Sequence, residues 1–83
     1  MTEYTKEVYR KKAGWYGYKI LRDGTPVIVQ DFKPSAEGFQ PMSEEFANIM
    51  ADALIAYYQL LDECKTPEEA NRVAAEFRLP VEG

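Results

Sequence analysis

Side chains that could do chemistry are few in this 83-residue chain, and their spacing keeps them apart. Histidine, the commonest general base and nitrogen ligand for metals, is absent. The single cysteine, Cys64, follows Asp62 and Glu63 at the end of an expected helix, where negative charge and the helix dipole oppose formation of a thiolate. We therefore interpret Cys64 as a packing residue and not as a nucleophile.

Acidic residues occur in pairs, but the members of each pair are adjacent in the sequence. On a helix, adjacent side chains point about 100° apart, so they do not converge on one substrate. The pairs are Glu44-Glu45, Asp62-Glu63 and Glu68-Glu69. The sequence also has no Gly-rich phosphate loop, no Cys-x-x-Cys and no His-Glu-x-x-His motif. We predict that the protein is not an enzyme and that it binds no cofactor or metal.

Charge is distributed unevenly along the chain. Residues 1–33 contain seven Lys or Arg against four Asp or Glu, whereas residues 34–83 contain three against ten. The net charge is −4, and an acidic total argues against general affinity for nucleic acid, which requires a basic surface. The sequence therefore predicts a basic half made of strands and an acidic half made of helices.

A β-hairpin is the strongest local prediction. Two β-prone runs flank Asp23-Gly24, a pair that supplies the positive φ values of a two-residue type I′ turn. In a regular ladder that starts at this turn, Ile20 pairs with Val27 and Tyr18 pairs with Val29 on one face. On the other face the pairs are Leu21 with Pro26, Lys19 with Ile28, Gly17 with Gln30 and Trp15 with Phe32. Weak alternation between Glu3 and Lys12 predicts a third strand.

Two helices are expected after the strands. Ser43 is a suitable N-cap, and the helix that it begins should run to about Glu63, with an apolar face wider than the ~100° of an ordinary surface helix. Thr66-Pro67-Glu68-Glu69 has the cap, proline and glutamate of a second, shorter helix that ends before Leu79-Pro80. Residues between Pro34 and Pro41 are predicted to form a loop.

Together these elements predict one small α+β domain over residues 1–83. An antiparallel sheet of two to three strands packs on one long helix, and a short C-terminal helix follows. The longest apolar stretch, Ala53 to Tyr58, is far shorter than the ~20 residues that span a bilayer. An N-terminus without a signal pattern and a single unpaired cysteine favour the cytoplasm.

The predicted hairpin has large apolar side chains on both faces, although one helix covers only one face. Either the second helix reaches the other face, or a partner such as another copy of the chain covers it. The predicted contact residues are Trp15, Lys19, Leu21, Ile28 and Phe32. We therefore predict a non-enzymatic binding protein that acts by protein–protein contact, with a homodimer as the expected assembly.

Single-stranded nucleic acid is the alternative partner. Aromatic residues of the hairpin, including Trp15 and Tyr18, lie among lysines of the basic half, and such surfaces bind single strands by base stacking and phosphate attraction. No defined RNA-binding motif accompanies them, so protein contact is the preferred hypothesis.

Part of the sequence resembles small uncharacterised proteins encoded by bacteriophages and prophages. The resemblance covers roughly residues 15–60 and rests on Trp15-x-x-Tyr18-x-Ile20, Asp23-Gly24, Gln30, Pro34, Gly38 and Met42-Ser43-x-Glu45. It implies a β-hairpin followed by a long helix, and a role as an accessory virion-assembly factor or as an inhibitor of one host protein. It implies no site residues.

Overall fold

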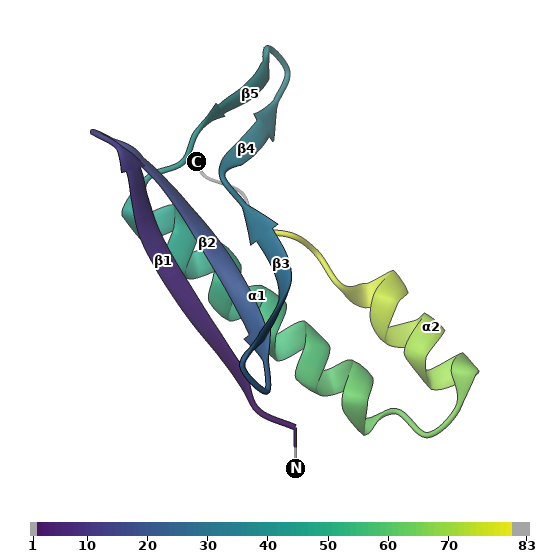
Figure 1. Ribbon diagram of the computed structural model, residues 1–83. Helices are drawn as coiled ribbons and strands as arrows, with labels where there is room; N and C mark the ends of the chain where they lie inside the picture. Colours follow the sequence, from purple (N-terminus) through teal and green to yellow (C-terminus); the bar gives the residue numbers. More distant parts are fainter. Residues whose placement is uncertain (1, 81–83) are drawn as a thin grey trace.

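Five strands precede two helices in the computed structural model, which describes residues 2–80 (Figure 1). The strands are β1 (Tyr4–Lys12), β2 (Trp15–Arg22), β3 (Thr25–Gln30), β4 (Phe32–Ser35) and β5 (Gly38–Pro41). The helices are α1 (Glu44–Glu63) and α2 (Pro67–Glu76). The predicted α+β class and both predicted helices are confirmed.

The first three strands form an antiparallel sheet in the order β1-β2-β3, which confirms the predicted third strand. Asp23 and Gly24 have φ values of 50° and 85°, as a type I′ turn requires. The turn is tied to β1 because the Asp23 N–H donates to the Glu3 carbonyl at 2.8 Å and the Glu3 N–H donates to Asp23 Oδ1 at 2.8 Å. The hairpin therefore forms where its turn residues predicted it.

The ladder between β2 and β3 is not regular, so the predicted register is wrong beyond the turn. Leu21 pairs with Pro26 as predicted, but Ile20 pairs with Ile28, and Val27 is left without a partner. Val27 is thus a β-bulge. Pro26 has no N–H to donate to a neighbouring strand, and both prolines and β-bulges occur mainly in edge strands. The bulge turns Ile28, instead of Val27, toward the face that carries Ile20.

A second hairpin occupies the segment that was predicted to be a loop. β4 pairs with β5 from Phe32 opposite Pro41 to Ser35 opposite Gly38. Gly38 has a φ of 114°, and the Ser35 hydroxyl donates to its carbonyl at 2.8 Å, which closes the turn. Phe32 therefore pairs with β5 and not with Trp15, which corrects that part of the predicted register.

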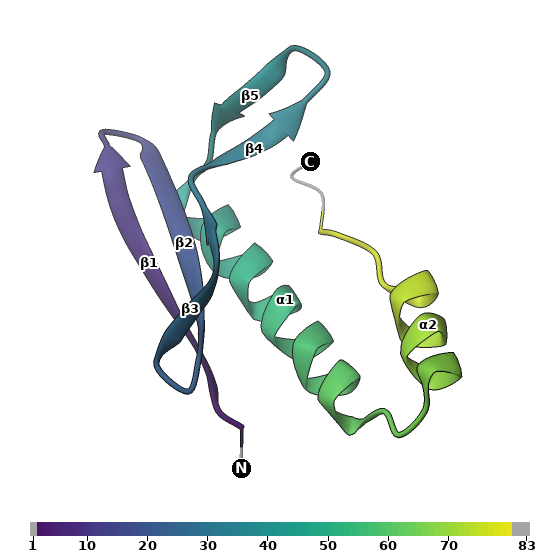
Figure 2. The same cartoon turned by 45° about the vertical axis from the view of Figure 1, so that its right-hand side comes forward.

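The core lies between α1 and one face of the three-stranded sheet (Figure 2). Its buried residues are Tyr18, Ile20, Met42, Phe46, Ala47 and Ala51. The small side chains of Ala47 and Ala51 let the helix approach the sheet closely, and the Ser43 hydroxyl caps α1 by accepting from the Phe46 N–H at 3.1 Å. Most contacts of α1 with the sheet are with β1 and β2, so β3 lies beside the helix and not under it.

The basic strands and the acidic helix are joined by exposed ion pairs. Lys6 Nζ lies 2.7 Å from an Asp52 carboxylate oxygen, and the Tyr4 hydroxyl donates to Asp62 at 2.7 Å. Arg22 lies 4.0 Å from the same Asp62 carboxylate. Exposed pairs of this kind contribute about 0–1 kcal/mol each, so they orient the helix more than they stabilise it.

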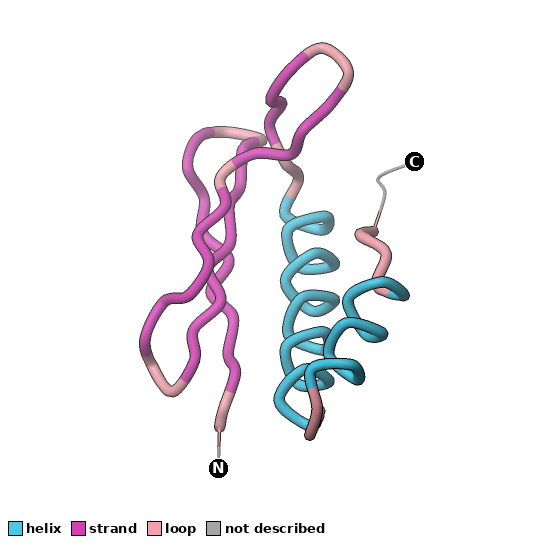
Figure 3. The backbone as a smooth tube through the Cα atoms, turned by 90° about the vertical axis from the view of Figure 1, so that its right-hand side faces the viewer, coloured by secondary structure: helices cyan, strands magenta, loops and turns pink. Residues whose placement is uncertain are grey.

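Helix α2 packs against α1 and lies on the same side of the sheet as α1 (Figure 3). It has no buried residue, and the Tyr57 and Phe77 rings stack at 4.3 Å between centroids where it meets α1. The alternative in which α2 covers the second face of the hairpin is therefore wrong. Among residues 2–80, neither helix combines the length and apolar character of a membrane-spanning segment.

We expect Thr66→Ala to destabilise α2, because its N-terminus is held by two hydrogen bonds between side chains and backbone N–H groups. The Thr66 hydroxyl accepts from the Glu69 N–H at 3.2 Å, and the Glu69 carboxylate accepts from the Lys65 N–H at 2.9 Å. The expected cost is about 0.5–2 kcal/mol, measured by denaturation and by amide exchange in α2. Thr66→Ser keeps the hydroxyl and is the control. An unchanged exchange rate in Thr66→Ala would contradict the role of the cap.

Candidate functional site

The five predicted contact residues fall on two different surfaces. Trp15, Lys19 and Leu21 lie on the sheet face that points away from α1, which we call the outer face. Ile28 packs against the core cluster, and both Ile28 and Phe32 line a groove beside α1. The bulge at β3 and the second hairpin cause this division, so one continuous contact surface of all five residues is not formed.

On the outer face, Asp31 joins all three strands of the sheet. The Tyr9 hydroxyl donates to one of its carboxylate oxygens, and Lys11 Nζ lies 3.0 Å from the other. The Trp15 indole N–H donates to the Asp31 carbonyl oxygen. Because Tyr9 and Lys11 come from β1 and Trp15 from β2, these bonds fix the end of β3 against both neighbours.

Tyr9 also fills the space above Gly17, which is a buried glycine in β2. A Cβ at Gly17 would lie 2.7 Å from the Tyr9 hydroxyl oxygen and 2.8 Å from the Gln30 carbonyl oxygen, so only glycine fits. Lys19 Nζ lies 5.6 Å from the centre of the Tyr9 ring. Tyr9 is thus held on several sides by its own chain.

The ring of Trp15 is also covered by side chains of its own chain. Lys11 Nζ and Lys12 Nζ each lie 5.1 Å from the centre of its ring, within the range of cation–π attraction. A nucleic-acid base that stacked on Trp15 would have to displace these ammonium groups. The outer face therefore offers fewer open aromatic surfaces than the sequence predicted.

The hydrogen bonds at Asp31 shift two pKa values in opposite directions. Burial, and then the bond to the Asp31 carboxylate, raises the pKa of Tyr9 from 10.0 to about 12. Bonds from the Tyr9 hydroxyl and from Lys11 lower the pKa of Asp31, because both stabilise its charged form. At neutral pH the pair is therefore a neutral phenol that donates to a carboxylate.

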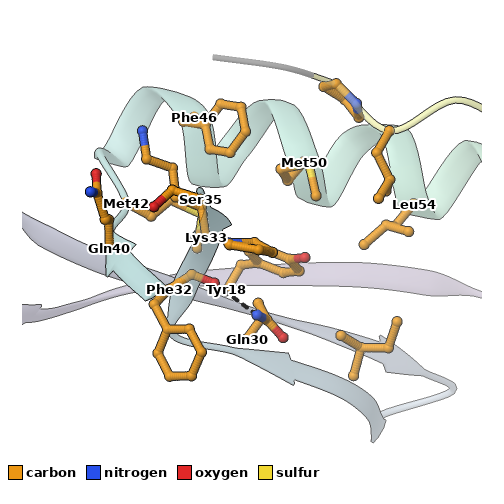
Figure 4. Close-up of a pocket in the computed structure, with 14 residues that line it drawn as sticks. Tyr18, Gln30, Phe32, Lys33, Ser35, Gln40, Met42, Phe46, Met50 and Leu54 are labelled. Atoms are coloured by element: carbon orange, nitrogen blue, oxygen red, sulfur yellow. Dashed lines mark hydrogen bonds between the residues drawn. The ribbon is translucent and has the colours of Figure 1, made fainter. Parts of the chain in front are cut away.

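A groove of about 590 Å³ opens on the other side of the sheet, between β3, α1, the β4–β5 hairpin and the segment 79–80 (Figure 4). We call it the β3 groove. Helix α1 contributes Phe46, Met50 and Leu54, and the sheet contributes Tyr18 and Ile28. It exists because α1 lies over β1 and β2 and leaves the helix-facing side of β3 uncovered.

The described residues that line the β3 groove are mostly apolar, and none of them is acidic. Among them the one charged residue is Lys33, whose Nζ lies 5.7 Å from the centre of the Phe46 ring. Gln30 is held by a bond from its side-chain amide to the Phe32 carbonyl at 2.7 Å (Figure 4). A groove with these properties favours apolar side chains over charged ones.

The two outer strands of the sheet differ in how their edges are protected. The β1 strand carries five charged residues, Lys6, Glu7, Arg10, Lys11 and Lys12, and charges of this kind prevent edge-to-edge pairing. The β3 strand carries none, and its valines Val27 and Val29 are 48% and 54% exposed. The β3 edge is therefore the one suited to pairing with another strand.

The hydrogen-bond pattern of the sheet directs the Val29 backbone toward this edge. The backbone groups of successive β2 residues hydrogen-bond alternately to β1 and to β3. Because the Asp23 N–H donates to Glu3, the odd-numbered residues of β2 are the ones that bond to β1. Lys19 therefore bonds to β1, and its partner Val29 is in a non-hydrogen-bonded pair. The N–H and C=O of Val29 consequently point away from β2, where the described chain places no strand.

The reactive residues identified from the sequence are not brought together. Cys64 lies at the C-terminal end of α1, half-buried, with its thiol 3.2 Å from the Leu60 carbonyl oxygen. Within residues 2–80, no three acidic or thiol side chains are grouped as metal ligands would be. The β3 groove was missed by sequence reasoning, although the unusually wide apolar face of α1 was a signal for it.

Comparisons of the chain with protein-family models, with curated proteins and with solved structures found no match.

We expect Tyr9→Phe to reduce the loss of stability at alkaline pH. Because the folded state raises the pKa of Tyr9 from 10.0 to about 12, its contribution is fully present below pH 10 and is lost as the pH rises toward 12. Burial also raises the pKa of Tyr18 and Tyr58, but both remain in the variant, so the difference between the two proteins isolates Tyr9.

The measurement is the free energy of unfolding of each protein across this pH range. Equal slopes for the wild type and Tyr9→Phe would contradict the bond from Tyr9 to Asp31.

Proposed function

We propose that this chain is a non-enzymatic protein-binding domain that pairs with a strand of another protein chain at the β3 edge. The observation that carries the proposal is the position of an uncharged, open strand edge directly beside an apolar groove. Either feature alone is common. Together they supply the two parts of strand addition, which are backbone hydrogen bonds and pockets for alternate side chains.

The geometry determines which groups would make each contact. The N–H and C=O of Val29 would bond to the added strand, since they point to the open edge. Alternate side chains of that strand would face α1, as Tyr18 and Ile28 do, and would enter the β3 groove between Met50 and the segment 79–80. The remaining side chains would extend the outer face next to Val29.

Apolar side chains are the expected occupants of the groove. Helix α1 lines it with Phe46, Met50 and Leu54, and no described residue of the lining is an acid that could pair with a basic partner. A charged side chain that entered would lose its hydration without gaining a partner of opposite charge, apart from an acid near Lys33. The bound strand is therefore expected to be apolar at the positions that face α1.

Single-stranded nucleic acid is less well supported, because Tyr9 and Trp15 are engaged with Asp31 and with nearby lysines. A role as a phage or prophage accessory protein, which the sequence resemblance implies, stays a prediction. A cytoplasmic location also stays a prediction. Both agree with a small domain whose activity is to bind another protein.

A photoreactive amino acid placed at Val29 tests the proposed binding edge. We expect Val29 to give covalent adducts with a protein chain in the cells that produce the domain, because this side chain flanks the added strand. Thr5, an exposed residue of β1, is the matched control position. Adducts are resolved by mass and identified by mass spectrometry. No adduct at Val29, or equal yields at Val29 and Thr5, would contradict the proposal.

A further inference from the structure

We infer that the strand bound at β3 belongs to a second copy of this chain, so that the protein is a two-fold dimer with the axis beside Val29. This inference rests on the proposed binding at the β3 edge and names its partner. Three properties of the structure support it: the symmetry of the edge, its charge and the surface area of the single chain.

The first property is that antiparallel pairing of two identical strands is two-fold symmetric. With the axis beside Val29, the N–H of Val29 in each copy donates to the Val29 carbonyl of the other. The pair is then a hydrogen-bonded pair, which is the arrangement that the outward-pointing groups of Val29 require. In this register, Ile28 of one copy lies opposite Gln30 of the other copy. Since Ile28 and Gln30 each face α1 of their own chain, Ile28 enters the β3 groove of the other copy.

The second property is charge. Each chain has a net charge of −4, so two copies repel unless they meet through a surface without acidic residues. The β3 strand has no charged residue, and none of the residues within 2–80 that line the groove beside it is Asp or Glu. The opposite edge, β1, carries Glu7 and four basic residues. Electrostatic repulsion between two copies is therefore smallest when they meet at the β3 edge.

The third property is surface area. The chain exposes 5856 Å², whereas a compact monomer of 9.5 kDa exposes about 5,050 Å². Its radius of gyration is 13.9 Å, against about 12 Å for a compact chain of this length. The chain is therefore less compact than a typical monomer of its size, with surface left that a second copy could cover.

Two features limit this pairing to a closed dimer. Pro26 has no N–H, and the bulge at Val27 twists the strand, so regular pairing is restricted to the segment from Ile28 to Gln30. The three-stranded sheet of each copy has one edge strand without charged residues, and pairing of the two β3 strands uses both of these edges. The charged β1 strands then form the ends of a six-stranded sheet and oppose further addition.

The test compares the solution mass of the wild type, Val29→Pro and Val29→Thr by sedimentation equilibrium. Val29→Pro removes an N–H that makes no bond within the sheet, so the fold is retained while the new ring blocks pairing. Val29→Thr keeps the N–H and a β-branched side chain. We expect twice the chain mass of 9.5 kDa for the wild type and Val29→Thr, and 9.5 kDa for Val29→Pro with an unchanged circular dichroism spectrum.

A second measurement uses the wild type alone. The Val29 amide should exchange more slowly with deuterium as the protein concentration rises, whereas the Lys6 amide, on the β1 edge, should not change. This readout does not depend on the folding of a variant.

A wild-type mass of 9.5 kDa up to about 1 mM, above the Kd of weak specific complexes, would overturn the inference. A dimeric Val29→Pro, or a Val29 exchange rate independent of concentration, would also overturn it. If the wild type is monomeric but the photoreactive group at Val29 captures a different protein, the inference fails and the proposed binding function stands. If it captures nothing, both fail.

Discussion

The unpaired residue Val27 in β3 is the constraint on which the rest of the structure depends. By inserting one residue after Pro26, it places Ile28 opposite Ile20 and turns Ile28 toward α1. The same insertion brings Val29 opposite Lys19, with its backbone directed to the open edge. Without the bulge, the side chains of β3 would exchange faces. The β3 groove would then lose Ile28, and the outer face would gain it.

The two faces of the sheet consequently have different properties. On the outer face, Asp31 accepts from Tyr9, and Trp15 donates to its carbonyl, so the large aromatic residues are bound within the chain. On the other face, α1 covers β1 and β2 and leaves the apolar side of β3 open. The sequence showed apolar residues on both faces. The structure shows that the uncovered apolar surface lies beside β3.

The elements set by short-range chemistry could be predicted from the sequence. Asp23-Gly24 determines the first turn, Ser43 begins α1, and Thr66 begins α2, because each acts on residues within four positions of itself. The bulge could not be predicted in this way, since its benefit is the burial of Ile28 against α1, which is distant in the sequence. The hairpin of β4 and β5 was missed because its prolines resemble those of a loop.

The positions of the predicted contact residues could be predicted only in part, for the same reason. Trp15, Lys19 and Leu21 follow from the alternation of β2, which is regular, and all three lie on the outer face. Ile28 and Phe32 were assigned to that face by continuing a regular ladder through the bulge and beyond Asp31. Their observed positions at the β3 groove depend on packing against α1 and on pairing with β5, and neither interaction has a local signal.

The register of the first hairpin tests the central claim most directly, and nuclear Overhauser effects between α-protons measure it. In antiparallel sheets the α-protons of a non-hydrogen-bonded pair lie close together, because the Cα atoms are only about 4.5 Å apart. The bulged register predicts a strong effect between Lys19 and Val29. A strong effect between Lys19 and Ile28 instead would mean a regular ladder, and it would contradict both the β3 groove and the orientation of Val29 toward the edge.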